Sequence, residues 1–148
     1  MITLFKTPNL SALPGVAVRI DASSAAVVFV GGGLGAVTRW ILAGLVQERT
    51  SNVTFPWGTF VVNLVGSLIL GFAMGATILH GVLTRTERLL VATGYAGGLT
   101  TFSTLSYETF MLIKEGLLEQ ALMNIILSLL GGLLMIYVGY TVAGLVYR

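Results

Sequence analysis

Long apolar segments separated by short polar ones make up most of this chain. The apolar segments cover about residues 24–46, 57–79, 89–113 and 118–146. Each is close to the ~20 apolar residues that an α-helix needs to cross a bilayer. A segment that crosses the bilayer must pair its backbone N–H and C=O groups within protein, and an α-helix pairs them all within its own segment. The pattern therefore predicts an all-α membrane protein with four transmembrane helices in one domain, residues 24–148.

The N-terminal residues 1–23 follow a different pattern, with Pro8, Pro14 and mixed polar side chains. They lack the long apolar stretch and the cleavage site of a signal peptide. We interpret them as an extension on the cytoplasmic or interfacial side of a multi-pass protein. The unequal distribution of Lys and Arg between the two ends of the apolar segments weakly favours a cytoplasmic N-terminus. Because this bias is weak, insertion in both directions is also permitted.

Composition supports the membrane interpretation and removes several classes of site. Among 148 residues, 55% are hydrophobic and 9% are charged, against about 25% charged in soluble domains. The chain has no cysteine and one histidine, His80, which excludes thiolate metal sites and histidine clusters within one chain. The net charge of +2 includes no basic run, so nothing indicates nucleic acid. A chain this short is small for enclosing a pore, so we expect a homo-oligomer.

The interior of the third apolar segment contains residues that a lipid-facing helix does not favour. Gly97 and Gly98 precede a run of hydroxyl side chains at positions 100–104. Each glycine weakens a helix by about 1 kcal/mol relative to alanine. Non-helical backbone at membrane depth occurs where it is buried in protein or lines a cavity. We predict a third helix that unwinds at the two glycines and forms an ion or substrate site there.

The polar side chains inside the apolar segments are mostly neutral, and the interiors of the first, second and fourth segments contain no carboxylate. This combination indicates a site for an anion. Hydroxyls and the amide of Asn63 direct hydrogen-bond donors at an anion. The edge of the Phe102 ring carries positive partial charge. Other interpretations are open: Asn63 as a hydrogen bond between helices, Phe102 as a core residue, and hydroxyls bonded to the preceding helical turn.

Two charged residues flank this polar region. Arg39 lies near the polar end of the first segment, where it snorkels, pairs with another group or faces a vestibule. Glu108 lies four residues after Thr104, hence on the same helical stripe. It either extends the polar track toward water or marks the end of the hydrophobic region.

Small residues recur at spacings that allow helices to pack closely in lipid. Gly31 and Gly35 form one such pair, and Gly71 and Gly75 form another. Close approach of backbones increases van der Waals contact, which drives helix association in membranes. We interpret these glycines as packing positions.

Three longer motifs resemble those of the Fluc/CrcB fluoride channel family. Residues 31–40 (GGGLGAVTRW) are similar to its GGxxGAxxR[YW] motif, and residues 58–67 (GTFVVNLVGS) to its second signature. Residues 94–104 (GYAGGLTTFST) are similar to its third. The motifs occur in the family order, and the resemblance covers about residues 25–147.

The resemblance implies a broken third helix and an antiparallel, dual-topology dimer in the cell (inner or plasma) membrane. Identical chains, or a chain and its paralogue, insert in opposite directions. The implied function is passive, fluoride-selective export that reduces fluoride toxicity, so the protein is a channel and no enzyme. A structural sodium ion is expected at the dimer centre, held by the main-chain carbonyls of Gly97 and Thr100.

The family pattern also assigns residues to the fluoride pathway. Asn63 matches the amide of the second segment, and Arg39 matches the arginine at the vestibule. The third motif supplies Phe102, Ser103 and Thr104, and Glu108 is the glutamate that follows it. Ser128 is the hydroxyl of the fourth segment. Leu105 is a departure, because the family usually has a second phenylalanine there. Leu105 lines the pathway in this interpretation but supplies no ring edge.

Two alternative functions compete with this expectation. A small dual-topology multidrug transporter needs an acidic residue in its first span, and residues 24–46 contain none. A non-transporting membrane protein needs only the glycine pairs for packing. It leaves the polar sequence at residues 97–104 without an explanation.

Overall fold

The computed structural model describes residues 21–50 and 54–147, and this part of the chain contains helices and no strand. Three helices are long and apolar enough to cross a membrane: α1 (Ala22–Arg49), α2 (Trp57–His80) and α6 (Leu118–Val146). Shorter elements lie between α2 and α6: α3 (Arg85–Arg88), the π-helix η2 (Leu89–Ala96), α4 (Gly97–Leu99) and α5 (Phe102–Lys114). The all-α prediction is confirmed.

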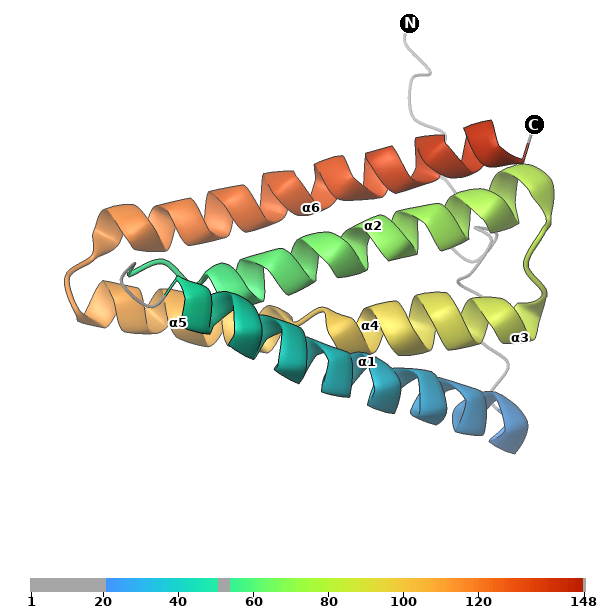
Figure 1. The fold of residues 1–148 in the computed structure, drawn as a ribbon, viewed down its shortest axis with the longest axis horizontal. Helices are drawn as coiled ribbons and strands as arrows, with labels where there is room; N and C mark the ends of the chain where they lie inside the picture. The colour runs from blue at the N-terminus through green and yellow to red at the C-terminus, as the bar shows by residue number, and fades with distance from the viewer. Residues whose placement is uncertain (1–20, 51–53, 148) are drawn as a thin grey trace, which may run out of the picture.

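The elements from α3 to α5 follow one another along a single line, so they form one interrupted rod (Figure 1). Helix α2 packs mainly against α6, and α1 packs mainly against η2 and α4. Helix α5 contacts α6 at one end of the molecule. The interruption between α4 and α5 lies near the middle of this rod, beside α1 and α2 (Figure 1).

Glycines bring the main chains of neighbouring helices into direct contact. A Cβ atom on Gly71 of α2 would overlap the main chain of Ile136 in α6. A Cβ atom on Gly35 of α1 would overlap the carbonyl of Tyr95 in η2, and one on Gly98 of α4 would overlap the main chain of Gly32. The packing interpretation of the glycine pairs is therefore confirmed for the contacts of α1 and α2.

The expected position of the break was wrong by a few residues. Gly97 has helical angles, φ −64° and ψ −37°, and Gly98 lies inside α4. The extended residues are Thr100 (φ −83°, ψ 156°) and Thr101 (φ −150°, ψ 116°). Gly98 serves close packing on Gly32, which requires no unwinding. Thr101 is the N-cap of α5, and an N-cap residue has extended angles.

The beginning of α1 also differs slightly from the expected boundary at residues 23 and 24. The helix starts at Ala22 because Asp21 caps it: the Asp21 carboxylate accepts a hydrogen bond from the Ser24 main-chain N–H at 2.8 Å. The remainder of the expected N-terminal extension, residues 1–20, lies outside the described residues.

Candidate functional site

Asn63 on α2 holds the main chain at the break. The Thr101 N–H donates to Asn63 Oδ1 at 2.7 Å, and Asn63 Nδ2 donates to Thr101 O at 3.2 Å. A break in a helix deprives backbone groups of their usual partners, and unpaired buried groups are costly. The Asn63 side-chain amide pairs with both the N–H and the C=O of Thr101, in place of the helical partners that these groups lack. The interpretation of Asn63 as a hydrogen bond between helices is therefore confirmed, and its role toward an ion is a separate question.

Arg39 on α1 binds the other end of the peptide group between Thr100 and Thr101, whose N–H Asn63 accepts. Its guanidinium donates from NH1 to Thr100 O at 2.9 Å. Arg39 is half-buried, and it lines a cleft between α1, α2 and α5. Of the alternatives for Arg39, the structure supports pairing with another group at the edge of a vestibule-like cleft.

Hydroxyl groups gather at the first turn of α5. Thr101 Oγ1 accepts from the Thr104 main-chain N–H at 3.2 Å and lies 3.0 Å from Thr104 Oγ1 and 3.2 Å from Ser103 Oγ. We call these three side chains the hydroxyl cluster. Ser103 and Thr104 are exposed in the single chain, and Thr104 also lines the cleft between α1, α2 and α5. The cluster therefore presents polar atoms on a surface that this chain does not cover.

The Phe102 ring is not part of the core of the chain. Its side chain is 82% exposed, beside the exposed members of the hydroxyl cluster. Leu105, one turn later, is half-buried, and its carbonyl accepts from the Thr109 hydroxyl at 2.8 Å. The core interpretation of Phe102 was therefore wrong for the single chain. The ring is available to a partner, to lipid or to an ion.

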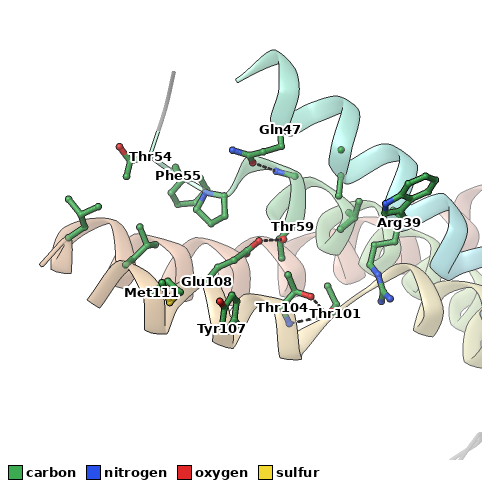
Figure 2. Close-up of a pocket in the computed structure, with 18 of the residues that line it drawn as sticks. Arg39, Gln47, Thr54, Phe55, Thr59, Thr101, Thr104, Tyr107, Glu108 and Met111 are labelled. Carbon is green, nitrogen blue, oxygen red and sulfur yellow. Dashed lines mark hydrogen bonds between the residues drawn. The ribbon is translucent and has the colours of Figure 1, made fainter. Parts of the chain in front are cut away.

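A cleft of about 710 Å³ extends from the break along α5. Figure 2 shows Arg39, Thr101 and Thr104 near one end, and Gln47 and Phe55 toward the other. The Gln47 side chain accepts from the main-chain N–H of Gly58 at the start of α2, at 3.1 Å. The cleft therefore joins the break to the loop end of α1.

Glu108 lines this cleft together with Thr59, a residue that the sequence motifs did not assign to the pathway. The Thr59 hydroxyl donates to Glu108 Oε1 at 2.6 Å (Figure 2). Glu108 Oε2 is buried and has no hydrogen-bond partner among the described residues. This geometry favours Glu108 as part of a polar track over Glu108 as a simple marker of the end of a hydrophobic segment.

Ser128 on α6 is not among the residues that line the cleft. It is buried, and its hydroxyl has no hydrogen-bond partner among the described residues. One turn earlier, Asn124 is fully buried and donates from Nδ2 to Thr109 Oγ1 at 3.0 Å. Asn124 was missed in the sequence, although an amide within the fourth apolar segment is a signal that finds it.

The expected sodium ion would have only main-chain and hydroxyl oxygen atoms as ligands at the break. The described residues contain no group of three or more His, Cys, Asp or Glu side chains that suits a metal ion. Gly97 lies on the exposed surface with open space around it. The Thr100 hydroxyl lies 3.1 Å from Ala96 O and 3.5 Å from Gly97 O. Of the two carbonyls expected to bind sodium, that of Gly97 belongs to an exposed residue, whereas that of Thr100 accepts a hydrogen bond from the Arg39 guanidinium.

The ionisable groups with shifted pKa values outside the apolar helices lie away from the break. At the start of α1, hydrogen bonds from the Ser23 hydroxyl and the Ser24 amide hold the pKa of Asp21 well below its usual range. Arg85 forms an ion pair with Asp21 at 3.4 Å and lowers this pKa further. Main-chain and side-chain hydrogen bonds from Thr84 lower the pKa of Glu87. These contacts fix the ends of α1 and α3.

The sequence is similar to those of a known family over most of its length. A family model described as "CrcB-like protein, Camphor Resistance (CrcB)" matches residues 26–140. A protein of Methanocaldococcus jannaschii named "Fluoride-specific ion channel FluC" is 43% identical over 122 residues, which cover 82% of this chain and 95% of that protein. Proteins of the same name from Pyrococcus furiosus and Serratia proteamaculans are 41% and 42% identical, over 84% and 76% of this chain and 98% and 87% of theirs. The chain therefore belongs to the CrcB family.

Proposed function

We propose that this protein is a fluoride-selective ion channel through which fluoride leaves the cell passively, which reduces its toxicity. One observation carries the proposal: Arg39, Asn63 and the hydroxyl cluster converge on the break between α4 and α5. In a chain of the CrcB family this is a concentration of hydrogen-bond donors without a catalytic constellation. A channel, and no enzyme, is the function that such a site supports.

The membrane arrangement follows from helix length. Helices α1, α2 and α6 each have enough apolar residues to cross a bilayer. The rod from α3 to α5, residues 85–114, is the fourth crossing in this proposal, interrupted at Thr100 and Thr101. Its non-helical residues are held by Arg39 and Asn63, as irregular backbone at membrane depth requires. The cell (inner or plasma) membrane is the expected location.

A second copy of the chain is needed to cover the exposed polar face. Phe102, Ser103 and Thr104 are all exposed in the single chain, and polar groups within a membrane usually face protein or a water-filled cavity and not lipid. A partner related by a twofold axis covers the same face on both chains. We propose an antiparallel homodimer, with a paralogous chain of opposite orientation as the alternative partner.

The same partner completes the proposed sodium site. One chain offers only two main-chain carbonyls to such an ion, those of Gly97 and Thr100, and the Thr100 carbonyl also accepts a hydrogen bond from Arg39. Two chains double that number. A bound sodium ion supplies a fixed positive charge beside the pathway and stabilises the dimer.

Fluoride selectivity requires donors that replace the water around a small, strongly hydrated ion. Asn63 has one amide hydrogen beyond the one given to Thr101, and the hydroxyl cluster supplies further donors. Phe102 offers a ring edge, and Leu105 supplies an apolar wall. Glu108 extends the proposed pathway toward water, and Ser128, which lies outside the cleft, would contribute to it from α6. Binding must also be weak enough to release the ion, as in any conducting site, and neutral donors satisfy this need.

A multidrug-type transporter is the alternative, and the position of the acidic residues argues against it. Such carriers rest on a carboxylate within the first membrane helix. The only carboxylate in α1 is Glu48, in the last turn of the helix. A substrate cation at the middle of the membrane therefore finds no acidic partner on α1.

Fluoride release from liposomes tests the proposed function. Purified protein is reconstituted in vesicles loaded with potassium fluoride, valinomycin is added, and external fluoride is followed with an electrode. We expect rapid fluoride release, with no comparable release of chloride from vesicles loaded with potassium chloride. Protein-free vesicles are the control. Absence of fluoride release, or equal release of chloride, contradicts the proposal.

A further inference from the structure

We propose that Arg39 and Asn63 act as positioning residues that clamp the two extended peptide groups of the break. Three hydrogen bonds from two different helices end on two consecutive residues: 2.9 Å to Thr100 O, 3.2 Å to Thr101 O and 2.7 Å from Thr101 N. Neither side chain belongs to the interrupted rod. The shape of the break is therefore set from outside the segment that contains it.

Asn63 behaves toward Thr101 as a peptide group of a neighbouring strand does. Only the amide oxygen accepts the Thr101 N–H, and only the amide nitrogen donates to Thr101 O. This pairing fixes the orientation of the Asn63 amide, with Oδ1 toward the Thr101 N–H and Nδ2 toward the Thr101 carbonyl. It also commits one of the two amide hydrogens to the backbone and leaves the other for a ligand. Asn63 therefore has a backbone role that is distinct from any contact with an ion.

Arg39 completes the clamp at the preceding residue. Thr100 N–H still donates to Ala96 O at 3.0 Å, as the last helical bond of α4. The Thr100 carbonyl is turned away from the helix, because Thr100 has extended angles, and it meets the guanidinium. Hydrogen bonds to a charged donor are stronger than neutral ones. Loss of Arg39 leaves this carbonyl without a charged partner at the first residue of the break.

The clamp holds the start of α5 in place. Thr101 is both the residue clamped by Asn63 and the N-cap whose hydroxyl accepts from Thr104 N–H. Phe102 follows directly, and little of it is covered by the rest of the chain, since it is 82% exposed. The position of its ring therefore depends on the main chain at Thr101. This inference rests on the proposed function only where it concerns fluoride release.

Hydrogen exchange at the Thr101 amide separates the backbone role from a ligand role. Exchange is followed by mass spectrometry of overlapping peptides across residues 97–105 of the purified full-length protein. Asn63→Ala removes the acceptor of the Thr101 N–H, so we expect exchange to rise about tenfold, the equivalent of about 1.4 kcal/mol for a lost hydrogen bond. Asn63→Asp keeps an acceptor at the same place, and its exchange should stay close to that of the unmodified protein.

Matched variants lie on the same helices. Ser67→Ala is one turn beyond Asn63 on α2, and Arg49→Gln is at the end of α1. Neither should change exchange at Thr101, whereas Arg39→Gln should raise it and Arg39→Lys should restore part of the protection. Melting temperatures identify any variant that loses its global fold. For such a variant, exchange is compared with that of the α6 peptides, and the clamp requires a selective rise at residues 97–105.

The outcomes distinguish this inference from the proposed function. Equal exchange in Asn63→Ala and Ser67→Ala overturns the clamp, even if Asn63→Ala slows fluoride release, because Asn63 is then only a ligand. Equal exchange in Arg39→Gln and Arg49→Gln shows that Arg39 is not part of the clamp. Selective exchange together with no fluoride release by the unmodified protein supports the clamp and contradicts the channel.

Discussion

Thr59 and Glu108 are joined by a 2.6 Å hydrogen bond that crosses the cleft from α2 to α5. The donor is a buried threonine, and the acceptor carries a second oxygen with no partner among the described residues. This bond connects the polar wall of the cleft to the helix that begins at the break. It links the packing of two helices with the chemistry of the candidate pathway.

Replacement of Thr59 by valine should destabilise the protein and slow fluoride release. Valine has nearly the shape of threonine but donates no hydrogen bond, so Glu108 loses its partner in the cleft. A buried acceptor left unpaired costs about 1–3 kcal/mol. Thermal unfolding in detergent and the initial rate of fluoride release measure the two effects. Thr59→Ser keeps the hydroxyl and is the control; equal behaviour of the valine and serine variants argues against the bond.

Replacement of Phe102 by isoleucine should slow fluoride release with little effect on the fold of the chain. The ring is 82% exposed, so its loss removes few contacts within one chain, whereas the proposed pathway loses an aromatic edge. We expect a decrease of about tenfold or more, the equivalent of at least ~1.4 kcal/mol. Phe110→Ile, at another exposed ring of α5, is the matched variant. Equal slowing by both substitutions assigns the effect to the helix surface.

Replacement of Gly98 by alanine should separate α1 from α4. The added Cβ atom overlaps the main chain of Gly32, which cannot rotate away. Overpacking of this kind typically costs about 1–3 kcal/mol. Gly33→Ala is the control, because a Cβ atom there meets nothing within 4 Å, and alanine favours a helix by about 1 kcal/mol. Comparable melting temperatures for the two variants contradict the close contact.

Removal of sodium should weaken the dimer. The proposed site uses the carbonyls of Gly97 and Thr100 from two chains, so its ligands are brought together only by assembly. Protein purified with N-methylglucamine in place of sodium should show a lower melting temperature, a larger monomer fraction and slower fluoride release. Added sodium should reverse all three changes. Indifference to sodium in every measurement argues against the carbonyl site.

The helical framework was largely predictable from hydrophobic segment lengths. The expected segment at residues 57–79 became α2, Trp57–His80, and the last segment became α6, Leu118–Val146. The π-helical geometry of η2 was not predictable, because an apolar run does not distinguish a π-helix from an α-helix. The pattern of apolar positions determines where a chain is buried, and it leaves backbone geometry within the segment open.

The position of the break illustrates why local propensity was insufficient. Glycine propensity favoured unwinding at Gly97 and Gly98, but Gly98 is held in a helix by its contact with Gly32. The N-cap pairing of Thr101 with Thr104 identifies the true start of α5. Thr59 and Asn124 were missed because a single polar residue in an apolar segment acquires its meaning only from the residue opposite to it.

The glycine contact between α1 and the interrupted rod has a mechanical consequence. Where the main chain of Gly35 meets that of Tyr95, and that of Gly32 meets Gly98, no side chain lies between them to change rotamer. The register of the two segments is therefore fixed at these points, because a shift by one residue would bring a Cβ atom against the main chain of the other segment. A displacement of α4 along its axis would thus require a matching displacement of α1, whereas side chains at the break can rearrange without either.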